Sequence, residues 1–521
     1  MKIVIIGCGP TALGAAYRLY DLQKSGQLLD NFSSAPPQLT VLEREDHAGG
    51  LAHSIRDQQG FLWDFGCHAT FSHYPYYDSA LDWAVDDWLF HLRNSKLDMA
   101  YLFHEGEEEK EEGVRLLPYP AQYSIPLFPE KKKRKCMAEL KSLLEEKPEI
   151  NGACIKMETV ENGVTKFDGG TLPESNGCQK SDSTPKDHNS TASQPAILTY
   201  EDWVLKSFGP SLADAFFRPY NKKLWTVDIA EMNAVWVGDR VARVNLALLE
   251  KLCAKDPREL EAADYGWGPN AKFRYPKFGG VGAVWRQMQA KLPQEWFHLS
   301  TEVVKVDSNQ KTVETSAGLT FPYDVLISTV PLTVIGRLTN LAPNIQLKNN
   351  RVVVIGLGLS APRPACLDSV HWLYFPSGDV PFYRVSVLSN YSPFVTPDPE
   401  SGQWSLMMEV ARAPEQDGTW SLDAVAEECQ EALIRKGLIG GRQQVISVHS
   451  TYVQHGYPIP TLARDEEIAK AQKVLEAHGI FSRGRFGGWK YEVSNQDHSF
   501  MQGKEVMDRI LLGKQETVYQ W

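Results

Sequence analysis

The sequence predicts an α/β fold with a parallel sheet and a separate β-rich region. Residues 2–6 form a short apolar run of the kind found in buried parallel strands, and a glycine turn and a helical pattern follow it directly. A second apolar run, at 38–42, ends on the acidic residue Glu43. Between 351 and 410, β-rich segments are separated by Gly, Pro and Ser turns, which indicates another sheet.

The turn after the first strand has the spacing of a dinucleotide-binding loop. Gly7, Gly9 and Ala12 occupy the fixed positions of the G-x-G-x-x-G/A pattern. The first two glycines allow a tight turn and a close approach of pyrophosphate, and the helix N-terminus that follows can hold the phosphate. Glu43 lies where an acidic side chain binds the adenosine ribose, although a predicted loop insertion at 25–37 lengthens the usual spacing. The alternative interpretation is a glycine turn that binds no ligand.

Length and composition indicate a large folded protein that does not act mainly on nucleic acid. With 521 residues, the chain is expected to form two or three domains. A formal net charge of −11 argues against nucleic acid as the main partner, because phosphate binding needs a broad basic surface. Neither a signal-peptide layout nor an apolar stretch long enough to cross a bilayer is visible, so no membrane association is expected.

Cysteine and histidine usage indicates a reduced, cytoplasmic protein without a metal site. The eight cysteines are scattered without a C-x-x-C pair, so neither a zinc knuckle nor a disulfide framework is expected. His68 and His73 stand five residues apart, but no further ligands at metal-binding spacing accompany them.

Motifs spread in order over nearly the whole chain resemble one family, the flavin-dependent UDP-galactopyranose mutases in their eukaryotic form. The matching segments are Gly7–Ala15, Gly66–His73, Arg218–Asn221, Gly266–Ala271, Trp372–Pro376, Pro381–Arg384, Ser389–Pro393, His455–Leu462 and Gly484–Met501. The last of these is long enough to be highly specific.

The resemblance implies three structural units: an FAD-binding Rossmann-like domain of the two-part flavoprotein kind, an inserted helical substrate domain and an antiparallel β-sheet domain. They are expected at 1–85, 236–330 and 440–515 for the discontinuous FAD domain, at 86–235 for the helical domain and at 331–439 for the sheet domain. Within the helical domain, residues 161–194 are mostly small and polar, which predicts a disordered insertion.

The resemblance also implies an isomerase without net redox change. In this family the non-covalent FAD must be reduced, by NADPH or NADH, before its N5 atom attacks the anomeric carbon of the sugar and displaces UDP. The resulting flavin–sugar adduct lets the ring open and close as the furanose, after which UDP returns. UDP-galactopyranose and UDP-galactofuranose are thereby interconverted.

The resemblance assigns the site residues. Catalytic roles are implied for His68, Arg218, Arg384 and Arg485. Substrate contacts are implied for Tyr119 and Gln122 at the uracil, Trp203 and Asn245 at the sugar, and Tyr374, Tyr457 and Tyr491 at the phosphates. FAD contacts are implied for Gly7, Gly9, Pro10, Thr11, Ala12, Glu43, Gly50, Leu51, His68, Arg485, Asn495 and Gln496. A leaving diphosphate needs concentrated positive charge, and arginine offers a planar donor fork suited to phosphate. Taken singly, the tyrosines could instead be packed aromatics and the arginines partners of core carboxylates.

The chain departs from the family pattern at four positions. Cys67 replaces a glycine in the flavin-facing turn, Ala121 and Tyr123 flank Gln122, and Thr199 stands where an asparagine or similar group helps the phosphate. These departures leave open which nucleotide sugar is preferred.

Other functions remain to be weighed against the mutase. A mutase for a different nucleotide sugar is one alternative. An FAD-dependent oxidase of the amine-oxidase type is another, because it shares the N-terminal fingerprint and the paired glycines, although its site should be apolar or amine-binding. A flavoprotein that has lost activity and serves as a binding partner is a third. The sequence leaves the oligomeric state open.

Overall fold

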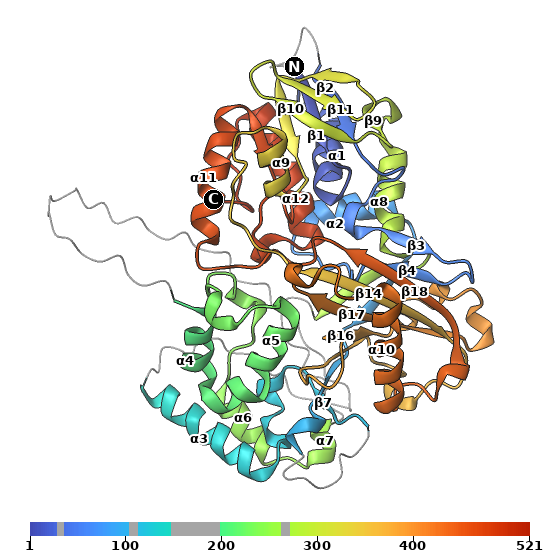
Figure 1. The fold of residues 1–521 in the computed structure, drawn as a ribbon, viewed down its shortest axis with the longest axis vertical. Helices are drawn as coiled ribbons and strands as arrows, with labels where there is room; N and C mark the ends of the chain where they lie inside the picture. The colour runs from blue at the N-terminus through green and yellow to red at the C-terminus, as the bar shows by residue number, and fades with distance from the viewer. Residues whose placement is uncertain (29–35, 104–112, 147–197, 262–270) are drawn as a thin grey trace, which may run out of the picture.

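The computed structural model describes residues 1–28, 36–103, 113–146, 198–261 and 271–521 (Figure 1). The predicted insertion at 161–194 and nearly all of the motif at 266–271 lie outside the described residues. Among the described residues, no helix combines the length and the apolar character that a membrane span requires.

A parallel sheet lies at the top of Figure 1, and β1 is its centre. In the order β19-β13-β1-β2-β9, its described strands are Ile480–Ser482, Val325–Ser328, Lys2–Ile6, Gln38–Leu42 and Phe297–His298. Ile5 of β1 is in register with Val41 on one side and with Ile327 on the other. The two strands predicted at 2–6 and 38–42 are therefore confirmed.

Helices cover both faces of this sheet, because β1 is apolar on both sides. Ile3 and Ile5 pack with α1 (Pro10–Lys24), α8 (Gly280–Lys291) and α12 (Gln496–Leu512). Val4 and Ile6 pack with α9 (Leu332–Leu338) and α11 (Arg464–Ala477). A small antiparallel sheet of β10 (Val303–Asp307), β11 (Thr312–Thr315) and β12 (Thr320–Pro322) flanks it.

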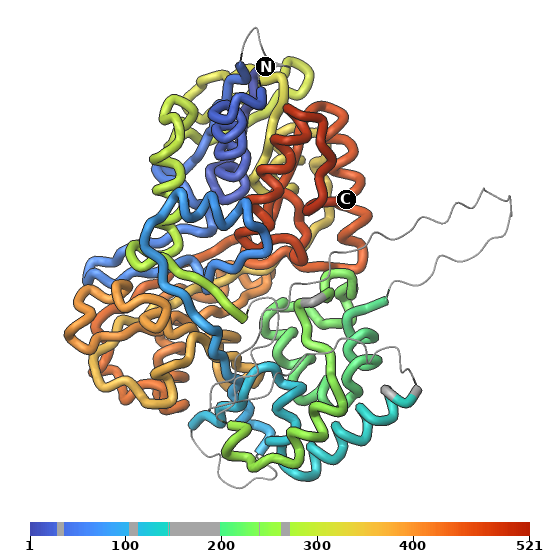
Figure 2. Tube along the Cα trace, turned by 180° about the vertical axis from the view of Figure 1, so that it is seen from behind, coloured from blue at the N-terminus to red at the C-terminus, as the bar shows by residue number. Residues whose placement is uncertain are grey.

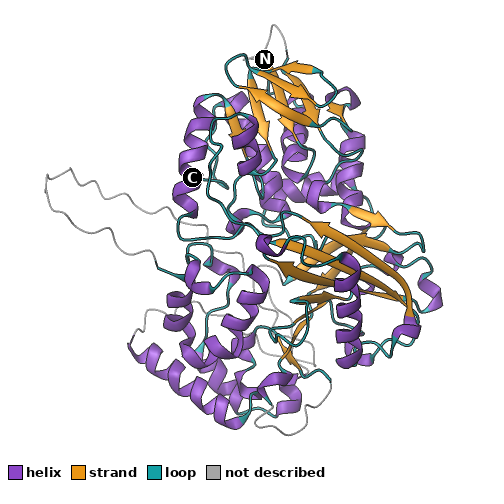
Figure 3. Ribbon diagram, in the orientation of Figure 1, coloured by secondary structure: helices purple, strands orange, loops and turns teal. Residues whose placement is uncertain are grey.

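A second, larger sheet crosses the middle of the molecule (Figure 3). In the order β18-β14-β17-β16-β15-β6-β7, its described strands are Val445–Val453, Arg351–Leu359, Trp404–Arg412, Arg384–Ser386, Trp372–Tyr374, Ser95–Asp98 and Leu116–Pro118. Helix α10 (Leu422–Arg435) packs on one face, and the hairpin β3 (Ser54–Arg56) and β4 (Leu62–Asp64) reaches the other. A Cβ at Gly356 would lie 2.5 Å from the Trp63 ring, so this contact requires glycine.

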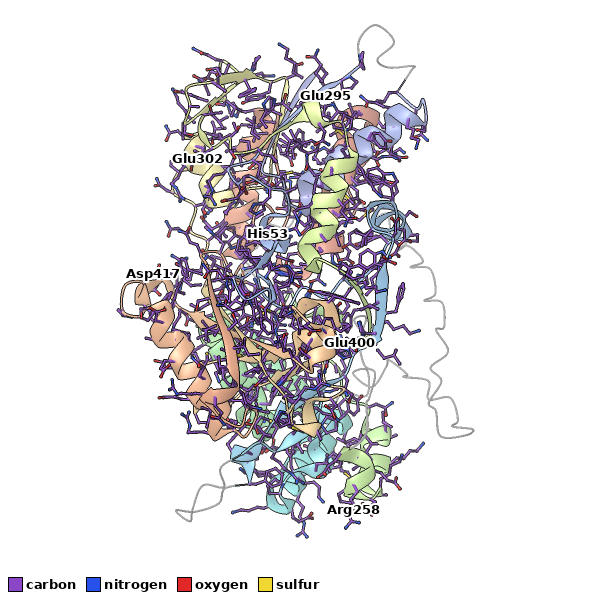
Figure 4. The ribbon with its side chains drawn as sticks, turned by 90° about the vertical axis from the view of Figure 1, so that its right-hand side faces the viewer. His53, Arg258, Glu295, Glu302, Glu400 and Asp417 are labelled. Atoms are coloured by element: carbon purple, nitrogen blue, oxygen red, sulfur yellow. The ribbon has the colours of Figure 1, made fainter. Side chains whose placement is uncertain are left out.

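Helices dominate the lower part of the molecule in Figures 1 and 3. They are α3 (Glu130–Glu146), α4 (Tyr200–Leu212), a π-helical turn at Ala213–Phe217, α5 (Arg218–Trp225), α6 (Leu246–Cys253) and α7 (Pro257–Glu261). Gly209, with φ of 78°, and Pro210 kink α4. Glu295 lies beside the parallel sheet at one end of the molecule, and Arg258 of α7 lies at the opposite end (Figure 4).

Seen from behind, the chain runs from α2 (Pro75–Ala84) down the back of the molecule towards the larger sheet (Figure 2). On the way, β5 (Trp88–Leu92) pairs antiparallel with β8 (Lys272–Pro276). This connection joins the parallel sheet to the lower units.

The observed units differ from the predicted domain boundaries in several places. Helix α9, predicted in the sheet domain, packs on the parallel sheet. Strands β6 and β7, predicted in the helical domain, and β18, predicted in the FAD domain, all belong to the larger sheet. Helices α6 and α7, predicted in the FAD domain, pack in the helical core through Leu249, Leu252 and Leu260. These memberships are decided by contacts between distant segments, which local residue patterns do not encode.

Candidate active site

The first glycine turn leaves the N-terminus of α1 open towards a ligand. Gly7 has φ of +97°, and a Cβ there would lie 2.3 Å from Thr329 Oγ1. Helix α1 begins at Pro10 after Gly9, and no described side chain caps its first turn. The first N–H groups of this 15-residue helix can therefore donate to an anion at the carboxyl edge of the sheet.

A second glycine turn lies against the first. The N–H of Gly49 donates to the carbonyl of Cys8 over 2.9 Å, and a Cβ at Gly50 would lie 3.4 Å from Gly9 Cα. Leu51 follows on this turn. The backbone of two separate glycine pairs is thus brought together, which suits an extended phosphate-containing group.

Glu43 lies directly after β2, at the same edge of the sheet. Its carboxylate accepts the N–H of Cys8 over 2.6 Å and the N–H of Glu45 over 2.9 Å. Burial raises the pKa of Glu43. The two backbone hydrogen bonds hold the Glu43 carboxylate at the place where a ribose hydroxyl is expected.

The turn Gly66–His68 approaches the same region from the hairpin side. The N–H of Cys67 donates to Glu409, and the carbonyl of His68 accepts the side-chain amide of Gln496 over 3.3 Å. His68 Nδ1 is buried and has no hydrogen-bond partner among the described residues. Burial, with the charges of Arg485 and Arg384, lowers the pKa of His68 to about 3, so this imidazole is neutral at physiological pH.

A cavity of about 160 Å³ lies between α5, the β15–β16 strands and the segments that carry Tyr457 and Tyr491. Its described lining contains four charged or amide side chains, Gln122, Asn221, Arg240 and Arg384, and no carboxylate. The remaining lining is mainly aromatic: Tyr119, Tyr200, Phe216, Phe217, Tyr220, Trp225, Trp236, Tyr374, Tyr383, Tyr457 and Tyr491. A larger hollow of about 590 Å³, between β10 and α9, lies on the surface away from these groups.

Six of the predicted substrate or catalytic residues meet in this cavity. They are Tyr119, Gln122, Tyr374, Arg384, Tyr457 and Tyr491. The rings of Tyr119 and Tyr374 lie 4.9 Å apart, and the hydroxyl of Tyr457 lies 3.3 Å from that of Tyr383 and 3.5 Å from a guanidinium nitrogen of Arg384. Arg485 lies behind this wall, with its guanidinium carbon 5.1 Å from the centre of the Tyr457 ring.

Glu409, on β17, holds Arg384 in place. One carboxylate oxygen lies 2.6 Å from Arg384 Nε, and the other accepts the N–H of Cys67 over 2.6 Å. Although burial opposes it, the charge of Glu409 raises the pKa of Arg384. The guanidinium at the cavity wall is therefore a permanent cation.

The structure does not bring Arg218, Trp203 or Asn245 into the cavity lining. Arg218 is paired with Asp214 and with Glu201, whose carboxylate lies 2.7 Å away. Trp203 stacks on Tyr200 within the helical core. Asn245 caps α6, its side chain accepting the N–H of Leu248 over 3.0 Å.

Structural roles also account for three of the departures from the family pattern. Thr199 caps α4 by accepting the N–H of Asp202 over 3.0 Å. Ala121 and Tyr123 are buried in the helical core, and the Tyr123 hydroxyl donates to the carbonyl of Arg243 over 3.0 Å. At the remaining departure, Cys67 Sγ lies 3.1 Å from the Tyr391 hydroxyl.

Sequence reasoning missed Glu409, Arg240 and several aromatic residues of the lining. Tyr220 lies within the Arg218–Asn221 motif and Trp225 lies shortly after it, so the motif could have pointed to both lining residues. Glu409 is a lone carboxylate in the apolar strand β17, and a charge in such a strand must find a partner. No signal in the sequence pointed to Arg240.

The described residues also contain one group able to surround a metal ion, formed by His73, Asp497 and His498, whose ligand atoms lie within 4.8 Å of one another. Sequence spacing could not reveal it, because His73 lies more than four hundred positions from the others. The buried Asp497 carboxylate already lies 2.6 Å from His73 Nδ1 and 3.0 Å from His498 Nδ1. Its hydrogen bond raises the pKa of His73. Asp497 thus holds His73 by a side-chain hydrogen bond, whereas His498 Nδ1 makes no hydrogen bond among the described residues.

The fold and the glycine turns define a dinucleotide-binding protein, and comparison with known families places it among the flavoproteins. Residues 13–355, more than half of the chain, match the family described as flavin containing amine oxidoreductase. A solved structure of a reduced UDP-galactopyranose mutase is 33% identical in sequence, with a TM-score of 0.78, and the match covers 99% of this chain and 96% of that one. This chain therefore belongs to the UDP-galactopyranose mutase family within the flavin-containing amine oxidoreductases, which confirms the resemblance to that family and the fold class. The eukaryotic form stays a prediction.

More distant structures share the fold alone. A putative protoporphyrinogen oxidase from Exiguobacterium sp. 255-15 is 13% identical with a TM-score of 0.66, over 98% of this chain and 99% of that one. A putrescine oxidase bound to putrescine is also 13% identical, with a TM-score of 0.57 and the same coverage.

Proposed function

We propose that this protein is a mutase that interconverts UDP-galactopyranose and UDP-galactofuranose with reduced FAD. The observation that carries the proposal is the cavity wall, where Arg384 and the Tyr457 hydroxyl come together and Tyr374 also lines the cavity, without a carboxylate among the described lining residues. Such a surface suits a diphosphate, because arginine and hydroxyl donors hold the charge that builds up as UDP leaves.

The residues present fit FAD. The open N-terminus of α1 and the facing Gly9 and Gly50 suit its pyrophosphate, and Glu43 suits its ribose. Asn495 precedes α12, and the Gln496 side chain links the indole N–H of Trp285 to the carbonyl of His68. When bound and reduced, the flavin supplies the nucleophile for the anomeric carbon, and the chain supplies the remaining functions.

Different residues of the chain bind different parts of the substrate. Tyr119 and Gln122 hold the uracil end, where the Gln122 amide is already fixed by the carbonyl of Ala242. Arg384 and the phosphate-facing tyrosines hold the diphosphate in position as it leaves and returns. The neutral His68 lies at the flavin-facing turn, where its Nδ1, which has no partner among the described residues, can donate or accept a hydrogen bond near the reacting centre.

Three further assignments belong to the proposal. Arg218, Trp203 and Asn245 contact the substrate only if α4, α5 and the segment before α6 close further onto the cavity than in this structure. NADPH or NADH reduces the flavin. The protein acts in the cytoplasm.

The test is an anaerobic assay of the FAD-loaded protein with UDP-galactofuranose, in which UDP-galactopyranose is followed by chromatography. We expect conversion with dithionite-reduced protein and none with the oxidised form. Arg384→Ala, with full FAD occupancy, should lose most of this activity, whereas Arg435→Ala on the exposed side of α10 serves as the matched control. No conversion by reduced, FAD-loaded wild type would overturn the proposal.

The family match also favours a second candidate, an amine oxidase. A cationic amine is held by carboxylates or aromatic rings, and the arginines at the cavity oppose it electrostatically. Hydrogen peroxide release from oxidised protein with putrescine, together with no conversion of the sugar nucleotide, would establish this candidate instead.

A further inference from the structure

We propose that Arg240 is a second phosphate-binding cation of the cavity, which holds the phosphate on the sugar side and lets the site distinguish a nucleoside diphosphate from a monophosphate. The inference rests on the proposed function, because it takes the ligand of the cavity to be a UDP-sugar. Neither the family motifs nor the site residues that they imply include Arg240. It belongs to the site because the fold brings it to the cavity lining.

Arg240 ends a short 3-10 helical turn, Gly238–Arg240. Its guanidinium carbon lies 4.5 Å from the centre of the Tyr491 ring, and one amino group donates to the carbonyl of Glu492 over 2.8 Å. The same amino group lies 3.4 Å from the side-chain oxygen of Asn495. Among the described residues, these hydrogen bonds use one of the three guanidinium nitrogens. The group is therefore held in place while the other two nitrogens can still donate to a ligand.

The charge of Arg240 has no carboxylate partner in the described part of the chain. No described carboxylate lies within ion-pair distance of its guanidinium. The carboxylate of Glu492, whose backbone Arg240 contacts, instead forms two bonds of 2.8 Å with the buried Arg464. Asp497, in the first turn of α12, is paired with His73 over 2.6 Å. A cation without such a partner at a cavity wall favours an anionic ligand.

Arg240 and Arg384 together give the described lining two cations. The charge of Arg384 is partly offset by Glu409, which lies 2.6 Å away, whereas that of Arg240 is not. Arg240 also acts on Arg485: burial lowers the pKa of Arg485, and the charge of Arg240 adds to this effect. Bound phosphate relieves the repulsion between these cations, and a diphosphate carries more negative charge for this purpose than a monophosphate.

The place of the Arg240 guanidinium indicates which phosphate it binds. The uracil is proposed to lie at Gln122, whose amide donates to the carbonyl of Ala242. The Arg240 guanidinium lies instead beside Asn495, the residue before α12 that is proposed to contact FAD. Along a UDP-sugar, the second phosphate is further from the base and nearer to the sugar than the first. A cation on the flavin side of the cavity is therefore expected to meet the second phosphate.

The test measures the dissociation constants of UDP and of UMP with reduced protein at saturating FAD, by anaerobic calorimetry and without any turnover. In Arg240→Met, the methionine keeps an apolar stem over the Tyr491 ring but removes the charge and the donors. We expect its dissociation constant for UDP to rise at least about tenfold, the scale of a lost charge-assisted contact, and that for UMP to stay within about twofold of wild type.

Two further variants complete the design. Arg240→Lys keeps the charge but loses the planar fork, so its dissociation constant for UDP should rise at least about threefold, again with UMP within about twofold. This variant decides the matter if Arg240→Met fails to fold. Arg243→Met is the matched control, because Arg243 lies in the same segment with an exposed side chain, and it should bind both nucleotides as wild type does.

The outcomes separate this inference from the mutase proposal. Unchanged UDP affinity in Arg240→Met overturns the role of Arg240. Equal losses of UDP and UMP affinity also overturn it, because they would mark a general change of the cavity rather than a contact with the second phosphate. In both cases the mutase proposal stands on its own conversion assay. Wild type that does not bind UDP overturns the diphosphate site, and the role of Arg240 with it.

Discussion

Arg384 is the residue on which the cavity's charge depends. It is the lining cation fixed by a buried carboxylate, and its side chain is 17% exposed towards the cavity. A hydrogen bond from a guanidinium to phosphate is stronger than a neutral one because both groups are charged. A guanidinium that is already fixed also loses little side-chain entropy on binding.

Arg384→Ala should weaken UDP binding by about 3 kcal/mol, the scale on which one partner of a buried charged contact is lost. Calorimetry with UDP measures the change. Because the substitution also leaves Glu409 without its cation, folding must be followed in parallel by thermal unfolding. Arg384→Lys restores the charge without the planar fork and should recover only part of the affinity; wild-type affinity in the alanine variant would remove Arg384 from the diphosphate site.

At the scale of elements, the packing of α1 against α12 holds the dinucleotide loop in place. The two helices approach so closely that a Cβ at Gly503 would lie 1.8 Å from the carbonyl oxygen of Thr11, and one at Gly14 would lie 2.1 Å from that of Phe500. Thr11 is in the first turn of α1, so any separation of the helices moves the N–H groups that face the phosphate.

Gly503→Ala should therefore lower the free energy of unfolding by about 3 kcal/mol or more and reduce FAD retention, because the backbone of α1 has to shift. Chemical denaturation and the flavin absorbance of the purified protein measure the two effects. Gly378→Ala is the control, since a Cβ there meets no atom within 4 Å. Equal stability of both variants would show that the helices separate without cost.

The sequence predicted those elements whose structure depends on neighbours along the chain. The apolar run, the glycine turn and the helix of β1 and α1 depend on local patterns and are observed as predicted. The larger sheet was predicted only in part, because β6 pairs with β15 across more than two hundred and seventy residues. Side-chain directions were less accessible still: Trp203 and Asn245 lie on predicted helical segments, and only the packing of the helices turns them away from the cavity.

For the whole molecule, buried histidines link stability to pH. Burial lowers the pKa of His53, which lies beside α8 in Figure 4, to about 4, and it lowers that of His371 and His455 to about 4 as well. Each of these imidazoles must stay neutral in the folded protein but takes up a proton near pH 6.5 when unfolded. Between pH 6.5 and 4 the unfolded chain therefore binds more protons, so stability is full above pH 6.5 and is lost as the pH falls.

His371 is the most direct test of this pH dependence. Its Nδ1 accepts the N–H of Asn94 over 3.0 Å, and its ring lies 5.1 Å from that of His91, so protonation costs both a hydrogen bond and a like-charge contact. In His371→Asn, whose side-chain oxygen can still accept from Asn94, the loss of unfolding free energy between pH 7.5 and pH 4.5 should shrink by up to about 3 kcal/mol. Urea denaturation at the two pH values measures this difference, with the exposed His298→Asn as control.

Burial raises the pKa of Asp64 to about 6, which changes stability with pH in the opposite sense. Asp64 is present in wild type and in both variants, so its effect cancels from the comparison. An unchanged pH dependence in His371→Asn would mean that other groups carry the acid sensitivity.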